Sequence, residues 1–304
     1  MSLSTPIYTL TGNLLAERTL EYETWEIGKT ERATRESFNT RGKGVNVSNM
    51  LARLGTDSTA LIFAGGPSGA ESEAWLRHRG ITYRNFETKQ AARTGTVIWS
   101  DQQAETTFLG PNATPDPDAI NACAHFLRNL PDGQVLALCG SFPGWEESDY
   151  RPLRAEIERW ARRGFLYVDA YGPPLQDIVS LPIELIKINR QEFDAFYTEE
   201  ERTQSVESRL RTACEKWDVK NWVISNGPAS VWMTSSKGDP IEFTPPKIKE
   251  VSPTGSGDVL FAVILHGLLT QQLPLVQAVE AALPYASANA AHPGVADFEI
   301  PPQV

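Results

Sequence analysis

Runs of apolar residues alternate with segments of amphipathic spacing along most of the chain. Short apolar runs bounded by turn residues are typical of buried strands, and apolar positions that recur every three to four residues are typical of helices. We expect strands at 7–12, 58–66, 134–141, 165–172, 183–189, 221–227 and 230–235, and helices at 45–55, 71–80, 116–130, 149–164 and 209–219. This alternation predicts an α/β fold in which helices cover both faces of a mostly parallel sheet.

Two stretches interrupt the alternation, at about 12–40 and 91–110. Polar and apolar positions alternate in both, with many Thr, Glu and aromatic residues, which indicates strands with one solvated face. We expect them to form a small sheet that stands off the main body as a lid or an interface. Exposed sheet edges favour pairing with another chain, so we expect a homodimer joined through this sheet.

The bulk composition narrows the possible partners. The 304 residues are 41% hydrophobic and carry a formal net charge of −10, which argues against nucleic acid because phosphate backbones require clustered cations. Phosphorylated small molecules remain open, since they need only a few local cations. No apolar run has the length of a membrane span, and the three cysteines form no C-x-x-C pair. We expect a cytoplasmic protein without a membrane partner.

The segment 251–269, VSPTGSGDVLFAVILHGLL, joins a glycine-rich turn to a strongly apolar helix. A helix that begins there directs free backbone N–H groups and its positive dipole end at the turn, and this geometry binds phosphate. Asp258 falls in the first turn of that helix. From this segment alone, a catalytic carboxylate and an aspartate that merely stabilises the helix start are about equally supported.

Two other motifs accompany this segment: TRGKGVNVSNMLARLG at 40–55 and KINRQEF at 187–193. With SPTGSGDVLFA they resemble, in order, the signatures of the ribokinase-like (PfkB) carbohydrate kinases. The opening YTLTGNLLAERTLEY is similar to the 1-phosphofructokinase and tagatose-6-phosphate kinase branch. The resemblance covers nearly the whole chain and implies one domain, residues 1–304, with a ribokinase-like three-layer α/β/α fold and a small β-sheet lid. The sequence has no P-loop motif.

The resemblance implies roles at the acceptor side of the site. Asp258 corresponds to the base that takes the proton from the acceptor hydroxyl. Gly255, Ser256 and Gly257 correspond to the turn whose amides form an anion hole for the transferred phosphoryl group, a reaction that needs positioning and charge stabilisation above all. The implied sugar-binding residues are Asn13, Glu17, Gly42, Gly44, Asn46, Arg93 and Ser141. Lys43 is expected to point away or to line the rim, without a role.

The nucleotide side follows from the same resemblance, with ATP and Mg²⁺ as the implied cofactors. Glu192 and Asn189 would hold Mg²⁺ through water, since Mg²⁺ usually keeps several waters. The same two residues also have the spacing of a helix capping box, and both interpretations can hold together. The implied nucleotide-binding residues are Lys187, Asn189, Ser225, Gly227 and Asn289. For Asn289, a packing position on a helix of small residues is equally supported, and for Lys187, so is a strand-end lysine whose charged end reaches solvent.

Two positions depart from the family pattern on the substrate side. Arg41 stands where the family has the first glycine of G-G-K-G, and Glu17 stands where an aspartate usually binds sugar hydroxyls. Arg93 corresponds to an arginine that phosphosugar kinases use for the substrate phosphate, whereas Thr107 replaces a second arginine of some relatives. The sequence therefore predicts a catalytic centre of the usual kind beside an altered substrate pocket.

The predicted function is ATP-dependent transfer of the γ-phosphate to a hydroxyl of a sugar phosphate, of the fructose-1-phosphate or tagatose-6-phosphate type. A kinase of an unphosphorylated sugar or other small alcohol is the alternative within this class. A non-catalytic sugar or nucleotide sensor is the alternative from another class. A nicotinamide oxidoreductase is disfavoured because no G-x-G-x-x-G motif follows a strand.

Overall fold

A computed structural model describes residues 6–301 except residues 101 and 237. Its strands are β1 (Ile7–Thr11), β2 (Leu15–Glu21), β3 (Arg35–Arg41), β4 (Ser58–Ile62), β5 (Tyr83–Asn85), β6 (Arg93–Ser100), β7 (Gln103–Leu109), β8 (Val135–Gly140), β9 (Phe165–Ala170), β10 (Leu185–Asn189), β11 (Asn221–Asn226), β12 (Ser230–Ser235) and β13 (Ile241–Phe243). Its helices are α1 (Lys43–Arg53), α2 (Gly66–His78), α3 (Pro117–Arg128), α4 (Arg151–Arg163), α5 (Pro173–Ile178), α6 (Arg190–Asp194), α7 (Glu199–Arg202), α8 (Val206–Lys216), α9 (Ser256–Leu269) and α10 (Leu275–Ala290), with a 3-10 turn at Ser148–Tyr150.

The large sheet has nine strands in the order β13-β12-β11-β10-β9-β8-β1-β4-β5. Strands β11 through β5 in this order are parallel, and β12 and β13 join as antiparallel edge strands. The parallel strands read as nearly continuous apolar runs because both of their faces are covered. The predicted mostly parallel α/β architecture is confirmed.

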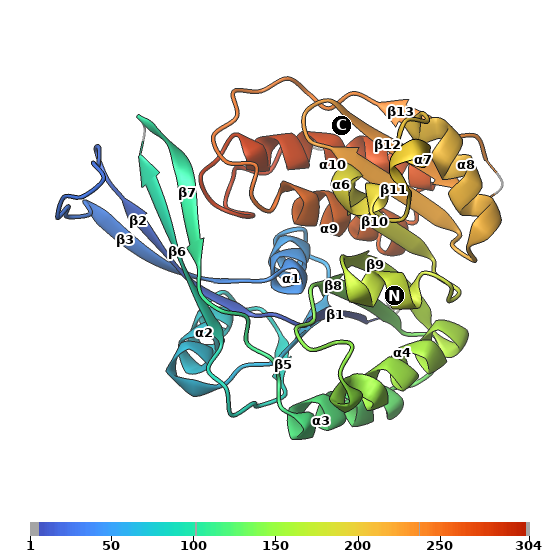
Figure 1. Cartoon of the computed structure of the whole chain (residues 1–304), viewed down its shortest axis with the longest axis horizontal. Coiled ribbons are helices and arrows are strands. Elements are labelled where there is room, and N and C mark those ends of the chain that lie inside the picture. The colour runs from blue at the N-terminus through green and yellow to red at the C-terminus, as the bar shows by residue number, and fades with distance from the viewer. Residues whose placement is uncertain (1–5, 101, 237, 302–304) are drawn as a thin grey trace.

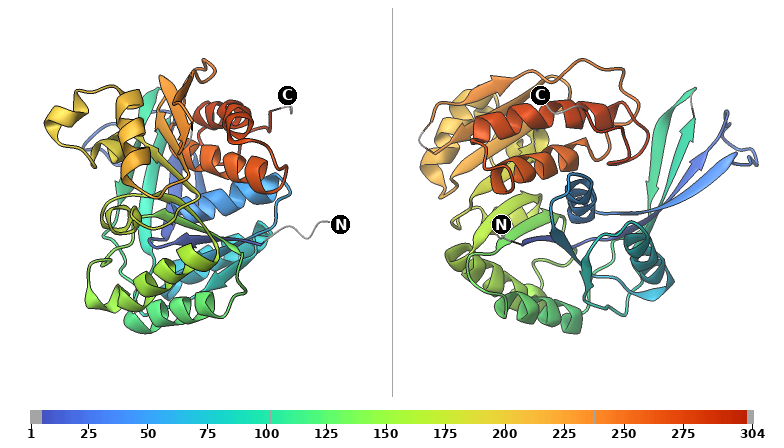
Figure 2. Two further views of the ribbon diagram at one scale, coloured as in Figure 1. Left: turned by 90° about the vertical axis from the view of Figure 1, so that its right-hand side faces the viewer. Right: turned by 180° about the vertical axis from the view of Figure 1, so that it is seen from behind.

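Helices pack on both faces of the large sheet (Figures 1 and 2). One face carries α1, α9 and α10, whose apolar residues form a core with Val135, Ala137 and Val223 of the sheet. The other carries α3, α4 and α8, packed around Leu136 and Trp222. Helix α9 is buried from Asp258 through Gly267, which explains why its sequence is apolar all round.

A separate four-stranded sheet, in the order β3-β2-β6-β7, projects from one side of the main body (Figure 1). Its strands fall within the two stretches predicted to form a small sheet. Strand structure was predicted throughout residues 19–39, but β2 ends at Glu21 and β3 begins only at Arg35. Between them the chain forms an exposed connection that turns at Gly28. That connection contains many charged side chains, and it is held to the sheet by the Trp25 backbone, which exchanges two hydrogen bonds with the Gln103 side chain of β7.

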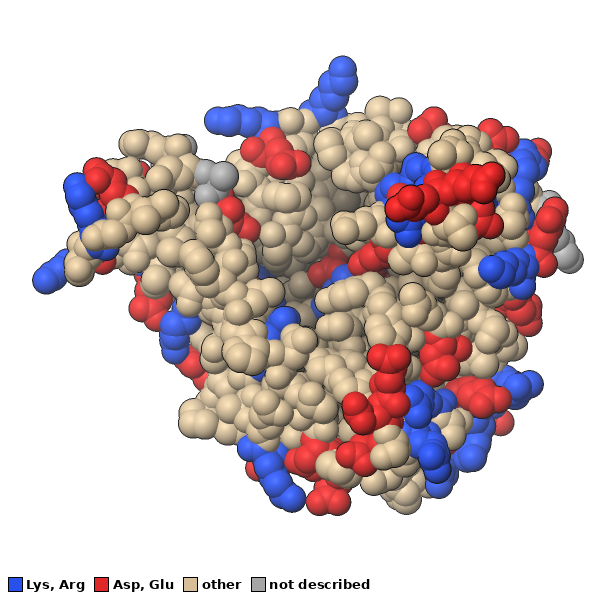
Figure 3. Space-filling view, viewed as in Figure 1, with Lys and Arg blue, Asp and Glu red and all other residues tan. Residues whose placement is uncertain are grey.

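The small sheet stands beside the carboxyl ends of β1, β8, β9 and β10, which is where ligands bind in parallel sheets. Figure 3 shows the surface hollowed between the small sheet and the main body, with acidic and basic side chains at the floor of the hollow. Among the described helices, none is both long and apolar enough to cross a membrane.

Candidate active site

The turn before α9 is fixed by close packing around Gly255. This residue has φ +76°, and a Cβ added to it would lie 2.3 Å from Cγ1 of Val295. Any other residue would therefore be strained and would collide with Val295. Because α9 begins at Ser256, its first amides lack intrahelical acceptors, and Ser256, Gly257 and Asp258 all line the cavity beside the turn. The Ser256 amide donates to the Pro253 carbonyl at 3.2 Å. The local geometry is that of an anion site.

Asp258 lies in the first turn of α9 with only 6% of its surface exposed. Asn46, on α1, donates a hydrogen bond from Nδ2 to Oδ2 of Asp258 over 2.7 Å. Burial, and then the nearby Asp169 carboxylate, raise the pKa of Asp258 to about 6, although Lys43, Lys187 and Asn46 act in the opposite direction. Asp258 is therefore poised to exchange a proton near neutral pH.

A buried cluster of charged side chains lies close to the Asp258 carboxylate. Asp169, at the end of β9, is 0% exposed and accepts hydrogen bonds from Lys43 Nζ at 2.7 Å and Lys187 Nζ at 3.0 Å. Burial alone would raise the pKa of Asp169, but the two lysines hold it below its ordinary value. Lys43 also contacts Glu192 Oε1 at 3.2 Å. Burial would lower the pKa of Lys43, but the surrounding carboxylates raise it, so Lys43 stays charged.

Two cavities meet at this cluster. The larger has a volume of about 670 Å³ and lies between the loop at 245–253, the start of α9 and the ends of β10 and β11. The smaller has a volume of about 280 Å³ and lies between the small sheet and the ends of β1 and β8. Asp258 and Lys43 line both. A group bound in one cavity therefore faces a group bound in the other across the Asp258 carboxylate.

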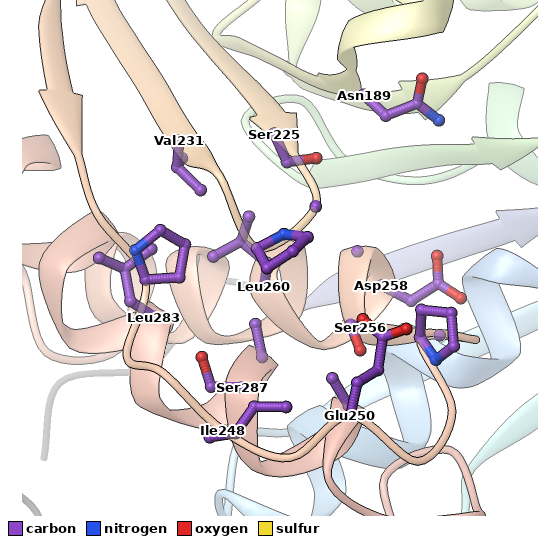
Figure 4. A pocket seen from close by; sticks show the side chains of 18 of the residues that line it. Asn189, Ser225, Val231, Ile248, Glu250, Ser256, Asp258, Leu260, Leu283 and Ser287 are labelled. Carbon is purple, nitrogen blue, oxygen red and sulfur yellow. The ribbon is translucent and has the colours of Figure 1, made fainter.

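The larger cavity has a polar end and an apolar end (Figure 4). Asn189, Ser256 and Asp258 lie toward the polar end, and Val231 and Leu283 lie toward the apolar end. The predicted nucleotide-side residues that line this cavity are Lys187, Asn189, Glu192, Ser225 and Gly227. The shape and polarity suit a ligand with an apolar ring at one end and an anionic group at the other.

Asn289 does not line this cavity, in contrast to the prediction of a nucleotide contact. Its side chain is fully buried behind the turn, where Nδ2 donates to the Thr254 carbonyl and to Ser256 Oγ, and Oδ1 accepts from the Ala296 amide. All of its polar atoms are used to hold the turn to the end of the chain. These contacts favour the packing alternative, in which Asn289 holds the turn in place.

Asn189 and Glu192 form a capping box at the start of α6. Glu192 Oε2 accepts from the Asn189 amide at 2.9 Å, and its Oε1 contacts Lys43. No group of three or more His, Cys, Asp or Glu side chains among the described residues could hold a metal ion directly. A carboxylate oxygen keeps a lone pair for a water molecule, so Glu192 fits Mg²⁺ held mainly by water and phosphate rather than by a protein cage.

The smaller cavity brings together most of the predicted sugar-binding residues, namely Asn13, Glu17, Gly42, Asn46, Arg93 and Ser141. Gly44 is the exception. It lies in the first turn of α1 against β1, and a Cβ there would approach Thr11 Oγ1 to 2.5 Å. Its lack of a side chain permits close packing of α1 on β1, and its predicted contact with the substrate stays a prediction.

Among the residues that the structure describes, four side-chain atoms at the smaller cavity are buried without a hydrogen-bond partner: Thr11 Oγ1, Asn13 Oδ1, Asn46 Oδ1 and Arg93 Nε. A buried polar atom without a partner costs about 1–3 kcal/mol. Such atoms are rare in folded proteins, and several around one cavity indicate a polar ligand. The set contains both donors and acceptors, which matches a ligand with several hydroxyl groups.

Arg41 and Glu17, the two departures from the family pattern, contact each other. Arg41 Nε donates to Glu17 Oε1 at 3.0 Å, and both side chains are buried at the wall of the smaller cavity. Arg41 Nη1 also donates to the Val295 carbonyl at 3.3 Å. The two residues that depart from the family pattern therefore form a buried ion pair with each other.

Asp169 carries no sequence-based prediction of a role, and Lys43 was expected at the rim. The structure instead places both at the centre of the charged cluster. One signal points to Asp169, since it is the charged residue of the buried strand FLYVDA and stands near its carboxyl end. For Lys43, the pattern alone does not distinguish a side chain directed inward from one directed outward.

Comparisons with known proteins agree with this geometry. The chain is 29% identical over 263 residues to D-tagatose-1-phosphate kinase of Bacillus licheniformis, covering 85% of this chain and 84% of the relative. It is 29% identical to 1-phosphofructokinase of Borreliella burgdorferi, covering 86% and 84%. The phosphofructokinase-2 of Escherichia coli in complex with fructose-6-phosphate has a similar structure, with a TM-score of 0.83, 23% identity and 94% of each chain covered.

Ribokinase from Thermotoga maritima has the same fold, with a TM-score of 0.73, 17% identity and coverage of 96% of this chain and 95% of that chain. The model of the pfkB family carbohydrate kinases matches residues 15–301. This match spans nearly the whole chain and includes all three motifs, so the resemblance noted in the sequence is confirmed. The chain belongs to the pfkB family of carbohydrate kinases, which are phosphotransferases that act on a sugar hydroxyl.

Proposed function

We propose that the chain transfers the γ-phosphate of ATP to a hydroxyl of a ketose phosphate, and that Asp258 is the general base. The observation that carries this proposal is the position of Asp258 in the wall shared by the two cavities. A base at that junction can take the proton of a hydroxyl in one cavity while a phosphoryl donor occupies the other.

The larger cavity is the proposed ATP site. Its apolar end suits the adenine ring, and its polar end brings Lys187 and the α9 amides near the phosphates. Lys187 Nζ lies where Gly257 leaves room, because a Cβ on Gly257 would be 2.6 Å from it. Mg²⁺ beside Glu192 would neutralise charge on the transferred phosphoryl group. Lys43 and Lys187 supply fixed positive charge at the same place, with no reorganisation during transfer.

The smaller cavity is the proposed sugar phosphate site. Its four unpartnered polar atoms suit hydroxyl groups, and its volume is at the lower end for small-ligand sites, as a monosaccharide requires. Arg93 is half-buried there and donates to Asn112 Oδ1 at 3.3 Å; among the described residues no carboxylate forms an ion pair with it. Arginine pairs well with phosphate, and the D-tagatose-1-phosphate kinase and 1-phosphofructokinase relatives are named for phosphosugars.

We further propose that two chains associate through the small sheet in the cytoplasm. Strands β3 and β7 are its edges. Ile27 is 92% exposed and Phe108 is 56% exposed, and both lie on this sheet or its connections. A second copy would cover these apolar side chains and the two edges of the sheet. The three free cysteines suit a reducing compartment.

The Asp258→Asn variant tests the proposed base. We expect kcat to fall about 10³-fold, because a general base commonly contributes 10²- to 10⁴-fold. The pKa of Asp258 is raised by about two units, so its charge costs about 3 kcal/mol of folded-state stability above pH 6. The variant should therefore be no less stable than the parent at pH 8 in chemical denaturation. Asp118→Asn, in the exposed first turn of α3, is the matched control. Near-normal turnover by Asp258→Asn contradicts the mechanism.

The pH profile provides a second test. Because the pKa of Asp258 is about 6 and the base must be ionised, kcat should be constant above that pH and fall tenfold per unit below it. The second ionisation of a sugar phosphate also lies near pH 6. Calorimetric binding of the sugar phosphate over the same range separates the two groups. A limb near the ordinary aspartate value of about 4 would contradict a raised pKa for the base, and loss of the limb in Asp258→Asn is the expected sign that Asp258 is the group that titrates.

Arg93→Ala tests the phosphate contact. We expect KM for the sugar phosphate to rise about ten- to hundredfold, because a charge-assisted hydrogen bond contributes about 1.5–3 kcal/mol. Turnover of the corresponding unphosphorylated sugar should stay unchanged. Arg84→Ala, on the far edge strand β5, is the control. Equal losses for both sugars would mean that Arg93 acts only by holding Asn112, and that the substrate carries no phosphate there.

The dimer is tested by molar mass in solution. At micromolar concentration, light scattering should give about twice the chain mass of 33.6 kDa. Phe108→Asp should reduce the mass to that of one chain, because it puts a charge into the proposed contact. Phe165→Asp changes an exposed phenylalanine at the start of β9, away from the small sheet, and should leave the dimer intact. A monomeric parent contradicts the proposal.

A further inference from the structure

The ion pair of Arg41 and Glu17 leaves two polar atoms without a protein partner. Within the described part of the chain, Arg41 uses Nε for Glu17 and Nη1 for Val295, and Glu17 uses Oε1 for Arg41. Arg41 Nη2 and Glu17 Oε2 remain, one a donor and one an acceptor. Both residues line the smaller cavity. The pair therefore offers a donor and an acceptor from adjacent positions of the cavity wall.

The register of the small sheet explains why the two side chains meet. Leu15 pairs with Arg41 and Glu17 pairs with Asn39, so Glu17 and Arg41 are diagonal neighbours on one face of β2 and β3. Diagonal neighbours of this kind are within reach when their side chains are long. An aspartate at position 17 would be one methylene shorter, so the longer carboxylate and the arginine suit each other.

Arg41 also connects the small sheet to the turn before α9 that contains Gly255, here called the catalytic turn. It donates to the Val295 carbonyl, and the Val295 side chain fills the space beside Gly255. A second contact runs in parallel, from Thr254 Oγ1 to Glu105 Oε1 of β7 at 3.1 Å. The strand that carries Arg41 is thus connected to the turn that binds the transferred phosphoryl group.

We propose that Arg41 is a specificity-determining residue with two roles. It binds one substrate hydroxyl together with Glu17, and it aligns the catalytic turn through its hydrogen bond to Val295. This inference rests on the proposed function of the two cavities. A hydroxyl both donates and accepts, so it can donate to Glu17 Oε2 and accept from Arg41 Nη2 at once. The substrate class is a sugar phosphate with a free hydroxyl facing the pair. A deoxy analogue at that position leaves a buried donor and acceptor unpaired and is rejected strongly.

A double-mutant cycle tests this pairing. Arg41→Gly leaves the Glu17 carboxylate buried without its cation, and Glu17→Asp draws the carboxylate back by one methylene from Arg41 Nε, which it contacts at 3.0 Å. Each change should lower kcat/KM for the sugar phosphate about hundredfold, with little change in KM for ATP. The double variant Glu17→Asp with Arg41→Gly restores the ordinary family pattern and should lie within about tenfold of the parent, which corresponds to strongly non-additive coupling.

Activity with altered substrates distinguishes a role of Arg41 in substrate recognition from a role in protein stability alone. Singly deoxygenated analogues of the accepted sugar phosphate should reveal one position at which the parent discriminates by at least hundredfold. In Arg41→Gly that discrimination should fall at least tenfold, and discrimination at the other positions should not change. Arg41→Lys keeps the charge but has one nitrogen in place of the guanidinium fork, so it should recover KM in part while kcat stays low.

Arg79→Ala is the matched control, because Arg79 pairs with Asp297 of the same chain end but lines neither cavity. It should leave kcat/KM and the analogue pattern unchanged. Additive losses in the cycle, or an analogue pattern that Arg41→Gly does not alter, overturn the inference even if the parent is an active sugar phosphate kinase. A parent that phosphorylates no sugar phosphate overturns the proposed function itself, so the two failures are distinguishable.

Discussion

The site depends on one buried carboxylate, that of Asp169, and on the two lysines that neutralise it. Lys43 is the first residue of α1, and Lys187 lies on β10. Because both donate to Asp169, this one carboxylate holds two distant segments of the chain against the end of β9. A buried ion without its partner is strongly destabilising, by about 3–5 kcal/mol. The need to satisfy Asp169 therefore fixes the start of α1, and with it Asn46, which holds Asp258. The same charges set the pKa of Asp258, since Asp169 raises it while the lysines lower it.

The catalytic turn is held mainly by packing and by backbone contacts. Gly255 takes a left-handed conformation against Val295, and Asn289 secures the turn to the last residues of the chain. Amides that are already oriented need no reorganisation when charge moves onto the transferred phosphoryl group. The end of the chain, although distant in sequence from the motifs, is therefore part of the same structural unit.

The sequence predicted those features that depend on local pattern. Alternation of apolar runs and amphipathic helices was sufficient for the parallel sheet, and the glycine turn before an apolar helix indicated an anion site next to Asp258. Features that depend on long-range contacts were missed. The glycine at position 44 was assigned to the substrate, but a glycine serves close packing as readily as ligand approach, and the sequence does not show that position 44 packs against Thr11. The sequence left the roles of Lys43 and Asn289 open for a similar reason, since several of the partners of each are far away in sequence.

Arg41 and Glu17 illustrate how two local irregularities become one feature in three dimensions. In the sequence, the arginine at position 41 and the glutamate at position 17 are two separate departures that would each alter a substrate pocket. In the sheet they are diagonal neighbours whose charges cancel, and their remaining polar atoms still line the cavity. The hydrogen bond from Arg41 to the Val295 carbonyl then connects the wall of the proposed sugar phosphate cavity to the turn before α9. A sugar that fits the pair poorly would disturb the turn as well, so selectivity in this chain should appear in the rate of transfer and not in binding alone.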